Sequence, residues 1–226
     1  LKETSMAEQK RIGVVLAGCG YLDGAEIQEA TLTLLSLDKR GVTVKAFAPD
    51  KPQMHVVDHR ITEPQEGVER NVLQESSRIT RGDIQPLSEF KADDVDALVF
   101  PGGFGAAKNL CNFAVEGANM SVDDDVRAAI ETVHAQGKPL GFICIAPVIG
   151  AKILGDKGVK LTIGNDEGTA QAVESFGAKH VHCEVHDAVL DAAHKVASCP
   201  AYMLGPSIAP VAEGIDKVIG AVVEWA

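Results

Sequence analysis

The sequence predicts an α/β domain with a mostly parallel, doubly wound sheet. Short apolar runs alternate along the chain with segments of helical periodicity, which is the pattern of repeated strand–helix–strand units. Hydrophobic residues make up 46% of the 226 residues and aromatic residues only 4%, so we expect a core of Val, Ile, Leu and Ala, as in a buried parallel sheet. The length suits one domain, because single α/β domains run to roughly 250 residues.

The first predicted elements form one strand–helix–strand unit. The apolar run Arg11–Ala17 predicts a strand that ends in a glycine-rich turn, and Glu26–Arg40 carries apolar residues at helical spacing. Gly41 ends that helix, and the run Val42–Ala48 predicts the second strand, which Pro49 closes. Two parallel strands joined by a helix are therefore expected at the start of the domain.

The middle of the chain continues the alternation. Residues 50–66 are polar and contain prolines, so we expect a loop there, followed by a helix over Val68–Thr80. The run Val95–Phe100 predicts a third strand. Ser121 and Asp124 resemble a capping box, which predicts the start of a helix that continues to Gln136.

A sharp strand-to-helix hinge is predicted at Cys144. The run Leu140–Ile143 is a fourth strand, and Ala146–Leu154 can form only a short helix, because Pro147 is tolerated in a first turn but not later. The remaining predicted elements are strands at Lys160–Ile163, His180–His186 and Lys195–Ser198 and helices at Thr169–Phe176 and Ser207–Glu224.

Composition limits the partners. The formal net charge of -11 argues against nucleic acid and against an anionic membrane surface, since both need clustered cations. No apolar stretch approaches the roughly 20 residues of a membrane-spanning helix. Five cysteines without a CxxC pair indicate free thiols in a reducing compartment. We expect residues 1–10 to lie outside the domain, as a frayed or expression-derived terminus, and residues 11–226 to form it.

Ligands of open α/β sheets bind beyond the carboxyl ends of the strands, where Cys144 lies. A thiol at a helix N-terminus feels the positive end of the helix dipole, which favours the nucleophilic thiolate. The alternative is an inert core thiol. The N–H groups of Gly103 and Ile145 could form an oxyanion hole beside it, although Gly102-Gly103 could equally be a plain turn.

Three further patterns each have a structural as well as a functional interpretation. Glu26 opens the first helix near the same edge of the sheet, but dipole stabilisation alone would also favour a carboxyl there. The spacing of Gly18 and its neighbouring glycines does not fit a dinucleotide fingerprint. His180, His182 and His186 would share one face of a strand, where a metal ion is conceivable, but an edge hairpin is the favoured interpretation. His186 could also approach Cys144 as a base.

Several segments together resemble a known family. The enhancing-lycopene-biosynthesis protein ElbB and its relatives have similar motifs, and they belong to the class I glutamine amidotransferase-like superfamily with the protease PfpI and the parkinsonism-associated deglycase. The resembling segments are GCGYLDGAEIQEA (18–30), NVLQESSRITRGDIQPL (71–87), FPGGFGAAKNLCNF (100–113), KPLGFICIAPVIGAKIL (138–154), LTIGND (161–166) and CPAYML (199–204).

The resemblance implies a flavodoxin-like three-layer sandwich, a homodimer and a nucleophilic cysteine at the elbow, which falls on Cys144. It also implies a glutamate in contact with that cysteine, and this falls on Glu26. The same neighbourhood would contain Asp23, Phe104, Asn109 and His186.

The implied activity is that of a glutathione-independent glyoxalase, a cofactor-free and metal-free lyase that converts a small reactive aldehyde, glyoxal or methylglyoxal, to the hydroxy acid. Ile145 stands where proteolytic relatives have His, and Pro200–Met203 stands where glutaminases have a His-x-Glu pair, so neither of those activities is expected. The alternatives are redox or stress sensing through Cys144, with its sulfinate stabilised by Glu26, and a partner-binding protein of isoprenoid metabolism. The expected location is the cytoplasm, or the mitochondrial matrix after removal of a transit peptide.

Overall fold

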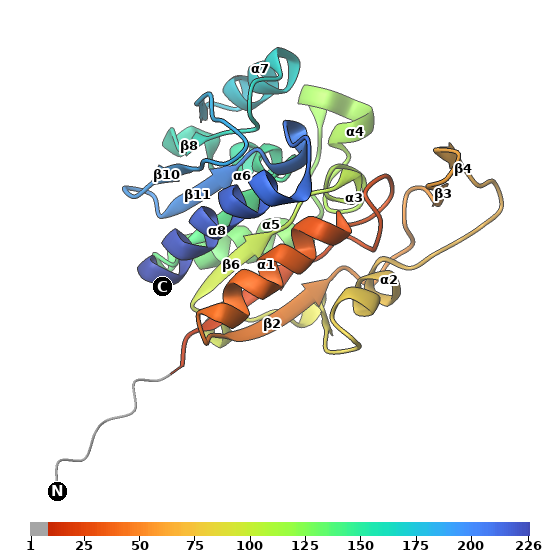
Figure 1. The fold of residues 1–226 in the computed structure, drawn as a ribbon, viewed down its shortest axis with the longest axis horizontal. Coiled ribbons are helices and arrows are strands. Elements are labelled where there is room, and N and C mark those ends of the chain that lie inside the picture. Colours follow the sequence, from red (N-terminus) through yellow and green to blue (C-terminus); the bar gives the residue numbers. More distant parts are fainter. Residues whose placement is uncertain (1–8) are drawn as a thin grey trace, which may run out of the picture.

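A computed structural model describes residues 9–226, which form a three-layer α/β sandwich around one seven-stranded sheet (Figure 1). The strand order is β10-β11-β7-β6-β1-β2-β5, and every pairing is parallel except that between β10 and β11. The strands are β1 Arg11–Val15, β2 Thr43–Ala48, β5 Gln85–Pro86, β6 Ala97–Phe100, β7 Leu140–Ile143, β10 Val189–Asp191 and β11 Val196–Cys199. The predicted doubly wound α/β class is confirmed.

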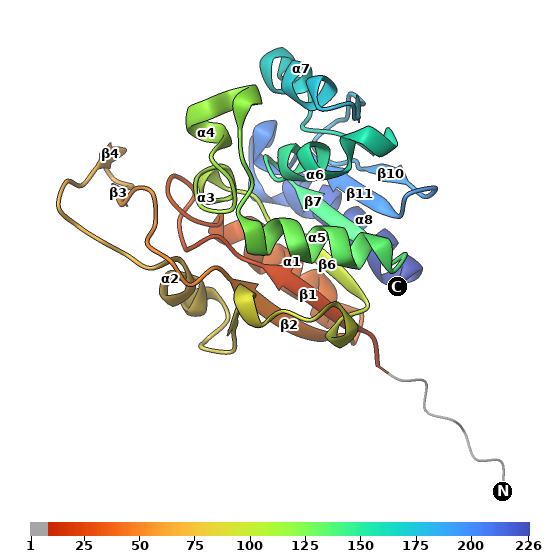
Figure 2. The same ribbon diagram turned by 180° about the vertical axis from the view of Figure 1, so that it is seen from behind.

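Helices cover both faces of the sheet. On one face α1 and α8 lie side by side, and on the other α5 and α6 cover the strands, as the front and rear views show (Figures 1 and 2). Each helix layer packs against its own cluster of buried hydrophobic side chains. The helices are α1 Ile27–Lys39, α2 Val72–Ile79, α3 Phe104–Lys108, α4 Phe113–Glu116, α5 Asp124–Ala135, α6 Pro147–Leu154, α7 Glu167–Ser175 and α8 Ile208–Trp225.

Two small two-stranded units lie outside the central sheet. Strands β3 (Val57–Asp58) and β4 (Glu63–Pro64) form a hairpin within the segment predicted as a loop. Strand β8 (Lys160–Leu161) pairs only with β9 (Lys179–His180). The predicted strands 160–163 and 180–186 are therefore shorter than expected.

Side chains explain why β8 is short and stays outside the central sheet. The Lys160 N–H donates to Asp191 Oδ2 at 2.8 Å, and the Thr162 N–H donates to Ser198 Oγ at 3.0 Å. These two N–H groups point away from β9, toward β10 and β11, whose side-chain oxygens bind them, so β8 does not join the central sheet through these groups. On the β9 side the ladder ends because the N–H of Ile163 donates to His180 Nε2 at 3.3 Å.

Helix starts also differ from the predictions. Helix α5 is capped by Asp123, whose Oδ1 accepts from the N–H groups of Asp125 at 3.1 Å and Val126 at 3.4 Å, so the predicted cap at Ser121 is wrong. Helix α2 begins at Val72 rather than Val68, since the Asn71 side chain caps it. The 3₁₀ helices are η1 Leu87–Glu89, η2 Ala92–Asp94, η3 Gly117–Asn119, η4 Gly155–Lys157 and η5 Ala201–Met203.

The register of the central strands brings three strand ends to one edge. Phe100 pairs with Phe142 and Ile143 pairs with Cys199, so the residues that follow β6, β7 and β11 emerge together. Within residues 9–226 no helix has the length and apolar character needed to cross a membrane. Most of the predicted terminal segment 1–10 lies outside the described residues.

Candidate active site

Cys144 occupies the turn between β7 and α6. Its φ of 63° lies in the left-handed region, which non-glycine residues rarely adopt, and its N–H donates to the Cys199 carbonyl oxygen at 3.0 Å. Pro147 then starts α6 at a position where a missing N–H costs nothing. The side chain is only 7% exposed but lines a cavity. The predicted strand-to-helix hinge is confirmed.

Gly102 lets the backbone after β6 approach the cysteine. A Cβ at this position would lie 2.4 Å from Cys144 Cβ and 2.7 Å from Glu29 Oε2, which is closer than real contacts allow. A residue with a side chain would therefore push these groups apart. Gly103 follows with a φ of 96°, which glycine tolerates, and its N–H donates to the Cys144 sulfur.

The glutamate that contacts the cysteine is Glu29, not Glu26. The Glu29 carboxyl is fully buried and shares a hydrogen bond with the Cys144 thiol. Its Oε2 accepts from the Gly102 N–H at 3.0 Å, and its Oε1 accepts from the Tyr202 N–H at 3.2 Å. Three strand-end turns therefore meet at this one carboxyl.

Glu26 has a different task. It is the N-cap of α1, and its Oε2 accepts from the Glu29 N–H at 2.6 Å while the residue lines the same cavity. The predicted contact between Glu26 and Cys144 is wrong because Glu26 precedes the first turn of α1, whereas Glu29 lies within that turn and is buried. A signal existed in the sequence: Glu29 stands on the buried face of α1 with Ala30 and Leu37.

Burial makes both partners reluctant to ionise. Desolvation and the neighbouring Glu26 charge raise the pKa of Glu29 to about 8, although bonds from backbone N–H groups oppose the rise. Desolvation also raises the pKa of Cys144 well above that of an ordinary thiol, with Glu29 contributing in the same direction. The predicted lowering of this thiol pKa is wrong, because burial outweighs the helix N-terminus. The resting site thus keeps its protons at neutral pH.

Two backbone donors converge on the sulfur. The N–H groups of Gly103 and Ile145 both donate to Cys144 Sγ and act to lower its pKa. These are the two groups predicted to form an oxyanion hole, and the structure brings them together. Oxygen bound to a carbon that has added to the sulfur would lie within their reach.

Of three other predicted site residues, two serve the scaffold and one lies outside the cavity. Asp23 is buried and accepts from the Val57 N–H at 2.8 Å. The amide of Asn109 donates to the carbonyl oxygens of Ala17 and Asp23, both at 2.9 Å. His186 is exposed and does not line the cavity.

The histidine-rich segment does not form a metal centre. The rings of His180 and His182 lie edge to face with centroids 5.5 Å apart and line a separate small cavity. In the part of the chain that the structure describes, no group of three His, Cys, Asp or Glu side chains could hold a metal ion.

A cavity of about 760 Å³ opens above the cysteine. Phe104 lines it as predicted, whereas α4, η3, the start of α7 and η5 contribute residues for which the sequence patterns indicated no role, although some of them fall within the segments that resemble the family. The lining residues are Tyr21, Glu26, Gly103, Phe104, Ala107, Phe113, Ala114, Val115, Gly117, Cys144, Ile145, Asp166, Thr169, Tyr202 and Met203.

The doubly wound sheet with a cysteine at its elbow defines a glutamine amidotransferase-like α/β protein. No family model matches the chain. Human glutamine amidotransferase-like class 1 domain-containing protein 3, mitochondrial, is 45% identical over 95% of the chain and 82% of its own length. The chain belongs to the family of that protein.

Solved structures agree with this placement. The isoprenoid biosynthesis protein with amidotransferase-like domain from Ehrlichia chaffeensis is 38% identical, with a TM-score of 0.88 over 96% of this chain and 100% of that one. A DJ-1 superfamily protein from Agrobacterium tumefaciens shares the fold at 18% identity, with a TM-score of 0.57 over 94% of this chain and 91% of its own. The predicted superfamily is confirmed.

Proposed function

We propose that the protein is a glutathione-independent glyoxalase that converts a 2-oxoaldehyde to the 2-hydroxy acid through Cys144. The observation that carries the proposal is the hydrogen-bonded Cys144–Glu29 pair, set beneath two converging N–H donors at the base of a cavity. Nucleophile, proton carrier and oxyanion donors are the parts that addition to an aldehyde requires. The resemblance to the ElbB group supports the same chemistry.

The first step joins the thiol to the aldehyde. The Cys144 sulfur attacks the aldehyde carbon while its proton passes to the ionised Glu29 carboxylate. The carbonyl electron pair moves to oxygen, which the N–H groups of Gly103 and Ile145 hold. Glu29 then returns the proton to this oxygen, and a neutral hemithioacetal results.

The second step moves hydrogen between the two carbons. Glu29 carboxylate removes the proton from the former aldehyde carbon, the electron pair forms a double bond to the neighbouring carbon, and the carbonyl pair of that carbon moves to its oxygen, which gives an enediolate. Glu29 returns the proton to the second carbon, and the hydroxyl proton of the first carbon passes to the oxygen of the second, which leaves a 2-hydroxy thioester of Cys144. Water hydrolyses the thioester, which releases the hydroxy acid and restores the thiol. One water is consumed, and no oxidant or reductant is needed.

Replacement of the nucleophile tests the proposal. Cys144→Ala is expected to abolish release of glycolate from glyoxal, measured by chromatography of the acid product. Cys183→Ala is a matched control, because Cys183 is a free thiol outside the cavity. Glyoxal turnover that is undiminished in Cys144→Ala would contradict the proposal.

A redox-sensing role is the second candidate. The donors around the Cys144 sulfur, two N–H groups and the protonated Glu29 carboxyl, could also stabilise a sulfinate. Mass spectrometry of peroxide-treated protein separates the two functions. Selective oxidation of Cys144 in a protein that turns over no dicarbonyl favours the sensor.

Two properties of the relatives bear on biological context. The name of the human relative places that protein in mitochondria, which supports the mitochondrial matrix over the cytoplasm for this chain. The name of the Ehrlichia protein supports a link with isoprenoid biosynthesis. A homodimer remains a prediction from the family resemblance.

A further inference from the structure

We propose that the cavity above Cys144 takes an uncharged 2-oxoaldehyde that carries an aromatic or branched aliphatic group, in preference to glyoxal or methylglyoxal. This inference rests on the glyoxalase chemistry proposed above and specifies its substrate class. The size of the cavity, its apolar lining and its charge each support it.

The cavity is large for a two- or three-carbon aldehyde. Its volume of about 760 Å³ falls within the roughly 300–1,000 Å³ of sites that bind drug-sized ligands. Glyoxal and methylglyoxal have only a handful of non-hydrogen atoms, so most of the space would stay filled with water. Apolar surface left in contact with water contributes no binding energy.

Apolar side chains line the part of the cavity beyond the sulfur. Phe104, Phe113 and Val115 come from α3 and α4, and Ile145 and Met203 come from the elbow and η5. Phe104 and Val115 are exposed, which leaves large apolar groups in contact with solvent at the site. Exposed apolar groups gathered at one cavity are typical of a ligand-binding groove.

The depth of each group sets the orientation of a bound substrate. Cys144, Gly103 and Ile145 supply the reacting sulfur and the oxyanion donors. Cys144 is almost buried, whereas Phe104 and Val115 are exposed. An aldehyde carbon in contact with the sulfur therefore leaves its substituent to extend outward along the apolar side chains.

The charges of the lining disfavour an anionic substrate. Among the described residues, none that lines the cavity is Lys, Arg or His, and two, Glu26 and Asp166, are acidic. Hydrogen bonds from Thr169 hold the pKa of Asp166 below its usual range, so its carboxylate is ionised at neutral pH. Lys108 lies over the Phe104 ring and does not line the cavity, and its ammonium is held by the Leu22 carbonyl oxygen at 2.8 Å. A negative substituent would thus meet acidic side chains and no cation in the lining.

A substrate series tests the inference. The values of kcat/KM are measured for glyoxal, methylglyoxal and phenylglyoxal as released hydroxy acid, with Cys144→Ala as the blank. Phenylglyoxal is expected to exceed methylglyoxal by about 10-fold, as a filled apolar pocket allows. 4-Carboxyphenylglyoxal, which adds one negative charge, is expected to fall about 10-fold below phenylglyoxal.

A pair of variants assigns the preference to the cavity. Phe104→Ala is expected to lower the ratio of the phenylglyoxal to the glyoxal kcat/KM by about 10-fold. Leu190→Ala is the matched control: Leu190 is 49% exposed, like Phe104, but it lies on β10 outside the cavity, so both rates should stay unchanged.

The outcomes separate two failures. If no 2-oxoaldehyde is turned over, the proposed function fails and the inference fails with it. If methylglyoxal is turned over as efficiently as phenylglyoxal, or if Phe104→Ala leaves the ratio unchanged, the chemistry stands and the inference about substrate class is overturned.

Discussion

Cys144 and Glu29 are buried together, and each makes ionisation of the other more costly. Four backbone N–H groups partly offset this cost: those of Gly102 and Tyr202 at the carboxyl, and those of Gly103 and Ile145 at the sulfur. Because two adjacent charges are strongly disfavoured, the pair carries at most one negative charge near neutral pH. The carboxylate form of Glu29, which must accept the thiol proton, is therefore the scarce species.

The pH dependence of catalysis should follow the ionisation of the Glu29 carboxyl. We expect kcat/KM to rise with pH and level off above an apparent pKa of about 8. Glu29→Gln keeps the shape of the side chain but removes the proton carrier, so kcat/KM should fall by about 10²- to 10⁴-fold and lose this pH dependence. Initial rates of hydroxy acid release from neutral to alkaline pH measure both effects.

Glu26→Gln is the matched control for that experiment. Burial raises the pKa of Glu26 too, but its carboxyl bonds the Glu29 N–H and not the sulfur. The rise of kcat/KM should therefore persist in this variant, displaced to lower pH because the Glu26 charge that raises the pKa of Glu29 has been removed. If Glu26→Gln removes the rise and Glu29→Gln keeps it, the assignment of the proton carrier to Glu29 is wrong.

Glu29 should also make the folded state less stable as pH rises. Its folded-state pKa of about 8 lies above the ordinary 4.5, so between these values the folded protein binds a proton that the unfolded chain has lost. The contribution of this proton to the free energy of unfolding is therefore fully present below pH 4.5, and it is lost as the pH rises through 8. Glu29→Gln should gain on the order of a few kcal/mol over the wild type across this window.

Urea unfolding at the two ends of the window measures that gain. The difference in the free energy of unfolding between Glu29→Gln and the wild type should grow in favour of the variant from acid to alkaline pH. A difference that stays constant with pH would show that Glu29 ionises as an ordinary carboxyl.

At the scale of elements, sequence patterns predicted the bounds of those strands and helices that are determined by neighbouring residues. Strand β7 and helix α6 have nearly the expected bounds, because an apolar run and the first-turn Pro147 act within a few residues. Position 29 was missed although α1 itself was expected, since which helical carboxyl faces the cysteine depends on how α1 packs on the sheet. Strand β8 is shorter than predicted because the side chain of His180, distant in sequence, binds the N–H of Ile163, which would otherwise continue the pairing with β9.

The start of α5 gives an element-scale prediction. Asp123→Ala removes the oxygen that accepts from two N–H groups of the first turn and also the ion pair with Lys51. We expect a loss of about 1–2 kcal/mol in the free energy of unfolding, measured in urea. Ser121→Ala should cost less than about 0.5 kcal/mol, because the Ser121 side chain makes no cap. Equal losses in the two variants would contradict the assignment of the cap.

At the scale of the whole molecule, the site is made by topology. The elbow could be predicted because the carboxyl ends of parallel strands define the functional edge. The walls of the cavity could not, because they come from α4, α7 and η5, short segments far apart in sequence whose motifs do not reveal which side chains face the cysteine. Their apolar residues look like ordinary core or surface residues until the fold brings them together.

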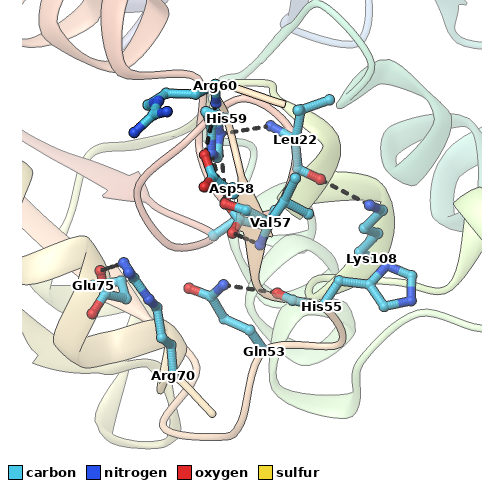
Figure 3. A network of polar contacts seen from close by, with 12 residues as sticks. Leu22, Gln53, His55, Val57, Asp58, His59, Arg60, Arg70, Glu75 and Lys108 are labelled. Atoms are coloured by element: carbon cyan, nitrogen blue, oxygen red, sulfur yellow. Dashed lines mark hydrogen bonds and ion pairs between the residues drawn. The ribbon is translucent and has the colours of Figure 1, made fainter. Parts of the chain in front are cut away.

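An arm formed by residues 51–71 extends from the body beside the loop that follows β1 (Figures 1 and 2). Its hairpin is tied to that loop by polar contacts, one of which is the bond from the Leu22 N–H to His59 Nε2 at 3.3 Å (Figure 3). The Leu22 carbonyl oxygen accepts from Lys108 of α3, which holds the loop itself in place. Asp23, buried in the same loop, accepts from the Val57 N–H at 2.8 Å. Few apolar contacts support the hairpin, so these bonds hold it in place.

Loss of the Asp23 carboxylate should release the arm without unfolding the domain. A buried hydrogen bond to a charged group is worth about 1.5–3 kcal/mol, so Asp23→Ala should raise the population of the detached arm by about 10- to 100-fold. Thermolysin cleavage within residues 51–71 should accelerate accordingly, while circular dichroism stays that of the folded protein. Arg60→Ala changes an exposed side chain on the same arm and should leave the cleavage rate unchanged. An Asp23→Ala protein that is cleaved at the wild-type rate would mean that other contacts hold the arm.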